Sequence, residues 1–216
     1  MPMVRLGLRI GKGANGGKDN FLQRAVKIGI EPALAEVAGG VGKAFVRLQI
    51  VPYNAFVSTA ERSVPSGDFF LRDYKKDDFD MLWRIDQQCF PPEIAYSTQE
   101  LRMYMQHRGA FTLVAAARED GPAAGFIVAH GGVVQGHIVT IDVSEQARRA
   151  GVGSLLLSGA EDRLRVSGSA AVALETAVDN APALSFYKRH GYSVVRVWPR
   201  YYSNGVDALV LSKNLR

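Results

Sequence analysis

The sequence predicts an α/β fold in which helices cover both faces of one mixed sheet. Short apolar runs alternate along residues 67–216 with longer segments whose apolar residues recur at helical spacing. The alternation is not strict, because three strand-like runs follow one another between residues 111 and 143 and two more come last. The expected order is therefore strand, two helices, three strands, helix, strand, helix and two strands.

Composition and charge narrow the class of protein. The 216 residues are 47% apolar and 22% charged, which is normal for a globular protein. No apolar run has the roughly 18 to 20 residues that a membrane helix needs. The single cysteine, Cys89, excludes an internal disulfide. We therefore expect a cytoplasmic protein without a membrane partner and without a metal site.

Charge divides the chain into two parts. Residues 1–66 hold 9 Lys and Arg against 4 Asp and Glu, whereas residues 67–216 hold 17 of each. The first part is rich in glycine and loosely patterned, so we expect a basic and poorly ordered N-terminal extension. The second part is a neutral domain of ordinary size. Nucleic acid is therefore not an expected partner of the core domain.

Each element of the domain has a local signal. Ser97 with Glu100 forms a capping box, Asn180 can cap the helix after it, and Gly191 stands where helices stop. Apolar runs predict strands at 69–72, 111–117, 124–130, 136–143, 171–176, 192–199 and 208–211. Helical spacing predicts helices at 77–88, 97–107, 151–166 and 181–190.

A glycine-containing turn at 148–153 joins the strand at 136–143 to the next helix. The start of a helix offers about four unpaired N–H groups and a partial positive charge, which together favour an anion. Gly151 and Gly153 let a phosphate approach the backbone, and Arg148 and Arg149 add positive charge. An ordinary strand-to-helix turn that needs glycine for its geometry is the alternative.

The run Arg148-x-x-Gly151-x-Gly153 after a strand resembles the acetyl-CoA motif of the GNAT superfamily of N-acetyltransferases. The resemblance implies the GNAT acyl-CoA N-acyltransferase fold, with a splayed strand pair, and acetyl-CoA as co-substrate. It implies that the pantetheine arm pairs with Ile141, Asp142 and Val143. It also implies that the pyrophosphate is held by the turn residues Arg148, Arg149, Ala150, Gly151, Val152, Gly153 and Ser154.

A second run, residues 174–192 (LETAVDNAPALSFYKRHGY), is similar to a pattern of protein N-terminal acetyltransferases, above all the ribosomal-protein alanine type. The tail from Tyr201 to Ala208 resembles the Y-Y-x-x-G-x-D-A of those enzymes. The resemblance implies Glu175 as base, Tyr187 as acid toward the departing sulfur, and Asn180 as a contact of the pantetheine amides. It also implies that the N–H of Val143 faces the developing oxyanion.

These residue types suit attack of an amine on a thioester. An α-amino group has a pKa of about 7.7–8.0, so roughly a tenth is neutral at pH 7 and a base of modest strength suffices. Each residue also has a plainer explanation. A glutamate on a strand is usually exposed, a tyrosine after Phe186 is usually core, and Asn180 can serve only as a helix cap.

The resemblance places the acceptor between the loop at 90–96 and the loop at 200–206. Phe90, Tyr201 and Tyr202 are the candidate acceptor contacts, with packing of the rim as the alternative. The loop lacks the Pro-Trp-Ser of the ribosomal-protein type. His130 and His137 have no metal-like partners in the sequence and are interpreted as structural or exposed.

The expected function is acetyl transfer from acetyl-CoA to a primary amine, with the N-terminal α-amine of a protein as the preferred acceptor. One alternative is a small-molecule acetyltransferase acting on a polyamine, an amino acid or an antibiotic. A second is a non-catalytic acyl-CoA-binding module, and a third is nucleic-acid binding by the basic extension. Either a monomer or a homodimer fits the sequence.

Overall fold

The computed structural model describes residues 6–7, 69–92, 94–132, 134–202 and 204–216, all within one compact unit. The extension expected at 1–66 lies outside these residues except for Leu6–Gly7, which forms the short strand β1. The predicted disorder of the extension therefore stays a prediction.

The expected mixed sheet is present and has one parallel pair. Its order is β2-β3-β4-β5-β6-β8-β7, and β1 pairs with β5 beside this path. Only β5 and β6 run parallel among the described pairs. The bounds are β2 Phe70–Asp73, β3 Ala110–Ala116, β4 Ala123–His130, β5 Gln135–Val143, β6 Ala171–Ala177, β7 Ser193–Trp198 and β8 Ala208–Asn214.

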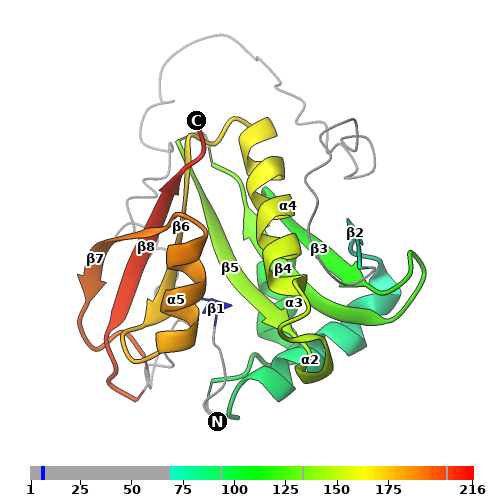
Figure 1. Cartoon of the computed structure of the whole chain (residues 1–216). Coiled ribbons are helices and arrows are strands. Elements are labelled where there is room, and N and C mark those ends of the chain that lie inside the picture. The colour runs from blue at the N-terminus through cyan, green and yellow to red at the C-terminus, as the bar shows by residue number, and fades with distance from the viewer. Residues whose placement is uncertain (1–5, 8–68, 93, 133, 203) are drawn as a thin grey trace, which may run out of the picture. The chain divides into compact units, whose positions relative to one another are not determined.

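Helices cover the two faces of the sheet, as the alternating pattern predicted. The helices are α2 Phe79–Cys89, α3 Thr98–Met105, α4 Val152–Val166 and α5 Ala181–Arg189, with short 3-10 turns at Lys76–Asp78 and Glu145–Ala147. One apolar cluster joins α4 and α5 to the sheet, and a second joins α2 and α3 to it. Figure 1 shows α4 and α5 in front of the strands.

Local capping signals set the helix ends where the sequence placed them. The Ser97 side chain accepts the Glu100 N–H while Glu100 accepts the Ser97 N–H, so the predicted capping box is confirmed. Asn180 accepts the Ala183 N–H as cap of α5. Gly191 follows α5 with φ +83°, a conformation that only glycine adopts without strain.

Leucine, isoleucine and valine side chains fill both clusters. The fully buried set includes Leu82, Leu113, Ile127, Ile138, Leu156 and Leu157. Burying each such side chain contributes about 1.5–3 kcal/mol, so the sheet is a rigid support for its loops. Among the described residues, no helix combines the length and apolar character needed to cross a bilayer.

Candidate active site

The parallel pair β5–β6 opens partway along its length. Its pairing runs only from Gln135 opposite Ala171 to His137 opposite Ala173, although β5 continues to Val143 and β6 to Ala177. Figure 1 shows the two strands diverging. This is the splayed strand pair that the sequence led us to expect.

The edge of β5 that faces β6 carries the three residues predicted to pair with a pantetheine arm. On their other side, Ile141, Asp142 and Val143 pair with β4. Their edge toward β6 accepts an extended chain, because Leu6 of β1 pairs antiparallel with Ile141 there. An extended arm with amide groups therefore has a suitable backbone edge at this position.

The turn before α4 concentrates backbone N–H groups. Gly151 caps the helix with φ +85°, and Arg149, two residues earlier, also has positive φ at +62°. Successive backbone N–H groups in a turn that includes left-handed residues can form an anion-binding concavity, or nest. The left-handed conformation costs a non-glycine residue about 1–2 kcal/mol. The backbone of Arg149 is therefore held in an unfavourable state that suits anion binding.

The Arg148 side chain turns back toward the end of β5. Its Nε donates to the Val143 carbonyl at 3.2 Å, and its Nη2 lies 3.6 Å from the Cys89 sulfur. Cys89 Sγ also lies 3.4 Å from the Val143 carbonyl. One guanidinium thus joins the last residue of α2 to the last residue of β5, a contact that the motif alone did not predict.

The Cys89 thiol stays protonated in this setting. Burial raises its pKa to about 12, the charge of Asp142 raises it as well, and Arg148 opposes both. A protonated buried thiol is a weak hydrogen-bond donor and a poor nucleophile. Cys89 therefore supports the structure of the site and is unsuited to covalent catalysis.

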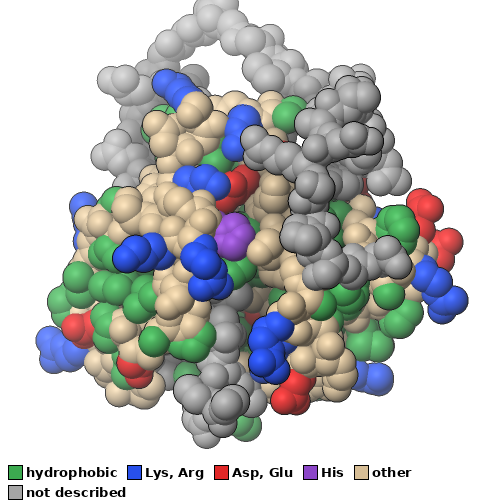
Figure 2. Space-filling model, in the orientation of Figure 1, with side chains coloured by type: hydrophobic (Ala, Val, Ile, Leu, Met, Phe, Trp, Pro, Cys, Tyr) green, Lys and Arg blue, Asp and Glu red, His purple; other side chains and the backbone are tan. Residues whose placement is uncertain are grey.

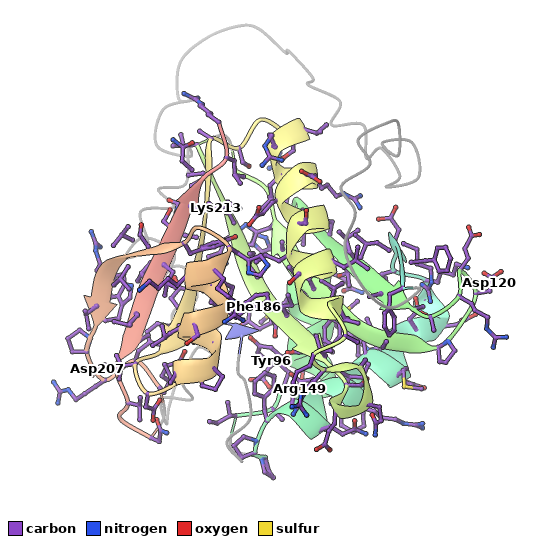
Figure 3. All side chains as sticks on the ribbon, in the orientation of Figure 1. Tyr96, Asp120, Arg149, Phe186, Asp207 and Lys213 are labelled. Atoms are coloured by element: carbon purple, nitrogen blue, oxygen red, sulfur yellow. The ribbon has the colours of Figure 1, made fainter. Side chains whose placement is uncertain are left out.

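Helix α5 braces the turn through two side chains. A Cβ added at Gly153 would lie 3.5 Å from the Phe186 ring, so this ring covers the turn. His190 Nδ1 lies 2.8 Å from the Phe186 carbonyl, and His190 Nε2 lies 3.0 Å from the Ser154 hydroxyl. Figure 3 labels Arg149 in this turn and Phe186 on α5.

Glu175 lies at the centre of β6 with no exposed surface. Its Oε2 is 2.8 Å from Nε2 of His137, which is 5% exposed. Its Oε1 has no hydrogen-bond partner among the described residues. A buried carboxylate oxygen without a partner is costly, so this atom is suited to receive a proton or a donor from a bound molecule.

Tyr187 supplies the second buried polar atom without a partner. Its side chain is fully buried in α5, and its hydroxyl has no hydrogen-bond partner within the described part of the chain. Burial raises the pKa of the phenol well above its ordinary value of 10.0, and Asp142, Tyr202 and Glu175 raise it further. The hydroxyl therefore lies within electrostatic reach of both carboxylates and remains a proton donor.

Of the two loops expected to hold an acceptor, the loop at 90–96 is hydrogen-bonded to α2. The Tyr96 N–H donates to Asp86 at 2.7 Å, and the Tyr96 carbonyl accepts from Trp83 and Gln87. Phe90 and Tyr202 are only 6% and 5% exposed, whereas the Tyr201 side chain is partly exposed. Of the three predicted acceptor contacts, Tyr201 is thus the one with substantial accessible surface.

Sequence reasoning missed His137 as a partner of Glu175. Ala173 is the parallel partner of His137, and Glu175 follows two residues later on the same face of β6. The register of β5 against β6 is the signal that would have joined them. In the described ranges, no group of three or more His, Cys, Asp or Glu is placed to hold a metal ion.

Comparison with known proteins agrees with this geometry. The chain belongs to the acetyltransferase (GNAT) family, whose model matches residues 79–192. It is 29% identical over 163 residues to an N-alpha-acetyltransferase of Sulfurisphaera tokodaii, covering 68% of this chain and 94% of that protein. The protein is therefore an N-acetyltransferase of a family that uses acetyl-CoA.

Two of the solved structures with a similar fold illustrate the likeness. Ard1 from Thermoplasma volcanium has a TM-score of 0.62 and 25% identity, covering 68% of this chain and 97% of that one. The ribosomal-protein-S18-alanine N-acetyltransferase of Escherichia coli has a TM-score of 0.60 and 22% identity, covering 68% and 94%. The second likeness concerns the fold alone.

Proposed function

We propose that this enzyme acetylates the N-terminal α-amine of a protein, using acetyl-CoA, with Glu175 as base and Tyr187 as acid. The observation that carries the proposal is a pair of buried atoms, Glu175 Oε1 and the Tyr187 hydroxyl, that have no hydrogen-bond partner among the described residues; Glu175 lies on β6 beyond its pairing with β5. The named similarity to an N-alpha-acetyltransferase supports the choice of acceptor.

The acceptor nitrogen attacks the thioester carbon directly. Oε1 of Glu175 takes a proton from this nitrogen, while His137 holds Oε2 in place. A base placed in this way contributes about 10²–10⁴ in rate. The N–H of Val143 is the proposed donor to the oxyanion. The nitrogen loses its proton during the attack, whereas the sulfur needs a hydrogen-bond donor later, when the carbon–sulfur bond breaks. A separate base and a separate acid therefore suit the reaction.

Tyr187 donates to the sulfur as the carbon–sulfur bond breaks. Its raised pKa keeps the phenol protonated as the thiolate forms nearby. An ordinary phenol already has a pKa about 1.5 units above that of a thiol, and the pKa of Tyr187 is raised further, so complete proton transfer to the sulfur is unfavourable. A hydrogen bond from Tyr187 to the sulfur is therefore the main contribution of this residue.

The coenzyme is held by backbone groups. The nest at 149–154 takes the pyrophosphate, the edge at 141–143 pairs with the pantetheine arm, and Asn180 contacts the arm beyond its role as helix cap. Tyr201 is the proposed acceptor contact, and the buried side chains of Phe90 and Tyr202 lie within the two loops that flank the acceptor. Figure 2 shows Lys and Arg scattered singly or in small groups over the described surface in view.

The test is turnover of acetyl-CoA against peptides with a free α-amine, peptides with a blocked N-terminus and one lysine, and polyamines. We expect the free α-amine peptides to be acetylated fastest. Glu175→Gln should reduce kcat about 10²–10⁴-fold. Glu119→Gln, at an exposed carboxylate in the turn between β3 and β4, is the matched control and should leave kcat unchanged.

Faster acetylation of polyamines would contradict the proposed acceptor and favour a small-molecule enzyme. An unchanged kcat in Glu175→Gln would contradict the proposed base. Binding of acetyl-CoA without turnover on any amine would instead favour an acyl-CoA-binding module. Localisation in the cytoplasm stays a prediction.

A further inference from the structure

Three histidines form a row that begins at Glu175 and ends at the surface. His137 on β5 hydrogen-bonds Glu175. The His137 ring lies 5.2 Å from that of His130, its cross-strand partner on β4, measured between centroids. The His130 ring lies 5.3 Å from that of His107, which is exposed just beyond α3. The row thus joins a fully buried carboxylate to solvent.

The proposed reaction requires such a route. The α-amine reacts in its neutral form and gives one proton to Glu175 as its nitrogen–carbon bond forms. The carbon–sulfur bond breaks, CoA leaves as a thiolate hydrogen-bonded by Tyr187 and then takes a proton from solvent, so the proton on Glu175 must itself reach solvent. Glu175 has no exposed surface, so it cannot return its proton to water directly. The enzyme is reset only when this proton has left the site.

The direction of the row separates proton exit from coenzyme binding. His137 lies near the start of β5, whereas the phosphate turn follows its last residue, Val143. His130 ends β4, and His107 lies in the segment that leads into β3. The row therefore leaves the site at the end of β5 opposite to the turn.

The middle histidine stays neutral at physiological pH. Burial lowers the pKa of His130 to about 3, and the neighbouring His137 and His107 lower it further. These two rings are the titratable groups that act on it. A neutral imidazole has one N–H and one lone pair, so it can accept a proton on one nitrogen while releasing one from the other.

We propose that His137, His130 and His107 carry the proton of Glu175 to solvent after each acetyl transfer, an inference that rests on the proposed function. His137 also positions Glu175, and His130 and His107 act only through it. A water bridging the nitrogens of neighbouring rings would complete each step of this relay. The row adds no bond to the substrate, so its loss should slow the resetting of the enzyme rather than the transfer itself.

The test separates the first turnover from later ones. Enzyme preloaded with acetyl-CoA is mixed with excess acetyl-CoA and a peptide carrying a free α-amine, and acetylated peptide is measured by rapid quench. We expect His130→Phe and His107→Ala to complete the first turnover at the wild-type rate. Later turnovers should be at least about threefold slower than in the wild type, and millimolar imidazole should restore them.

Arg108→Gln is the matched control, because it removes a charge beside His107 but no imidazole, and it should behave like the wild type. His107→Ala keeps the test valid if His130→Phe folds poorly, since the His107 side chain is exposed. Wild-type later turnovers in both histidine variants would overturn the proposal. So would an equal slowing of first and later turnovers, or a slowing that imidazole does not relieve.

The proposed function can fail separately. It fails if the wild-type chain acetylates no α-amine or if Glu175→Gln is fully active. The histidine row fails alone if turnover depends on Glu175 but not on His130 and His107.

Discussion

His137 Nε2 and Glu175 Oε2 lie 2.8 Å apart at the place where β5 and β6 cease to pair. The contact leaves Oε1 as the only carboxylate oxygen of Glu175 without a partner among the described residues. Because His137 sits at the last paired position, the rigid part of the sheet orients the proposed base, and in the opening beyond it β5 pairs with the short strand β1. The Tyr187 hydroxyl, which likewise has no hydrogen-bond partner within the described part of the chain, is the proposed acid.

Tyr187→Phe should separate activity from stability. The hydroxyl is buried without a hydrogen-bond partner in the described structure, so its removal costs no internal hydrogen bond. We expect an unchanged or higher thermal unfolding temperature, together with a loss of kcat of about 10²-fold. Steady-state kinetics and thermal unfolding on the same sample check this. A loss of kcat that tracks a lower unfolding temperature would argue for a packing role instead.

The positive φ angles at the phosphate turn give a second prediction. Arg149→Gly relieves about 1–2 kcal/mol of left-handed strain, so stability should rise while the dissociation constant of CoA changes little. Gly151→Asp places a carboxylate beside the nest and should abolish CoA binding, as measured by calorimetry. Gly168→Asp is its matched control, because Gly168 also has positive φ at +92° and its added Cβ meets nothing within 4 Å.

If Gly168→Asp weakened CoA binding as much as Gly151→Asp, the cause would be general destabilisation. Weak binding in Arg149→Gly would show that the Arg149 side chain, rather than its N–H, contacts the coenzyme.

The local part of this structure could be predicted from sequence. The Ser97–Glu100 capping box, the Asn180 cap and the stop at Gly191 depend on residues at most a few positions apart, and all three are confirmed. The fold class followed from the same kind of signal, since strand and helix periods are local patterns. The resemblance of residues 148–153 to a known motif supplied the family, which the comparisons confirm.

The long-range contacts of the candidate site could not be predicted, because they depend on strand register and on the direction of side chains. The pairing of His137 with Glu175 requires the parallel register of β5 and β6, which joins residues 38 positions apart. Arg148 reaches back to Cys89, 59 residues away, although its motif suggested a phosphate contact. The burial of Tyr202 likewise results from packing around the last strands. Single-sequence patterns carry no information on these distant contacts.

Cys89 should resist alkylation in the folded protein. Cys89 is 3% exposed, so a reagent cannot readily reach its sulfur. Its pKa is raised to about 12, so very little of the reactive thiolate is present at pH 8. We expect iodoacetamide to leave the native chain unmodified for hours and to label it within minutes in urea. Mass spectrometry of the intact protein measures both. Native labelling at the urea rate would show that the contact with Arg148 and Val143 opens readily.

The pair Arg72–Asp78 predicts how stability depends on pH. The guanidinium makes two bonds of 2.7 Å to the carboxylate, and the side chains are 7% and 12% exposed. Burial raises the pKa of Asp78, but the hydrogen bonds from Arg72 and from the Lys75 N–H outweigh it. The net pKa is below its ordinary value of 3.8. The pair therefore contributes stability above about pH 4, and this contribution disappears as pH falls through the lower, folded-state pKa.

Arg72→Met should lower the free energy of unfolding at pH 7 by about 1–3 kcal/mol, because it leaves the half-buried Asp78 carboxylate without two charged hydrogen bonds. The difference from the wild type should shrink below about pH 4, where protonation of Asp78 removes the unpaired charge. Urea unfolding at several pH values measures both effects. Lys75→Met is the matched control, since it breaks the exposed pair with Asp120 and should cost less than about 1 kcal/mol. A constant difference between pH 7 and pH 3 would show that Arg72 stabilises the fold through packing rather than through its charge.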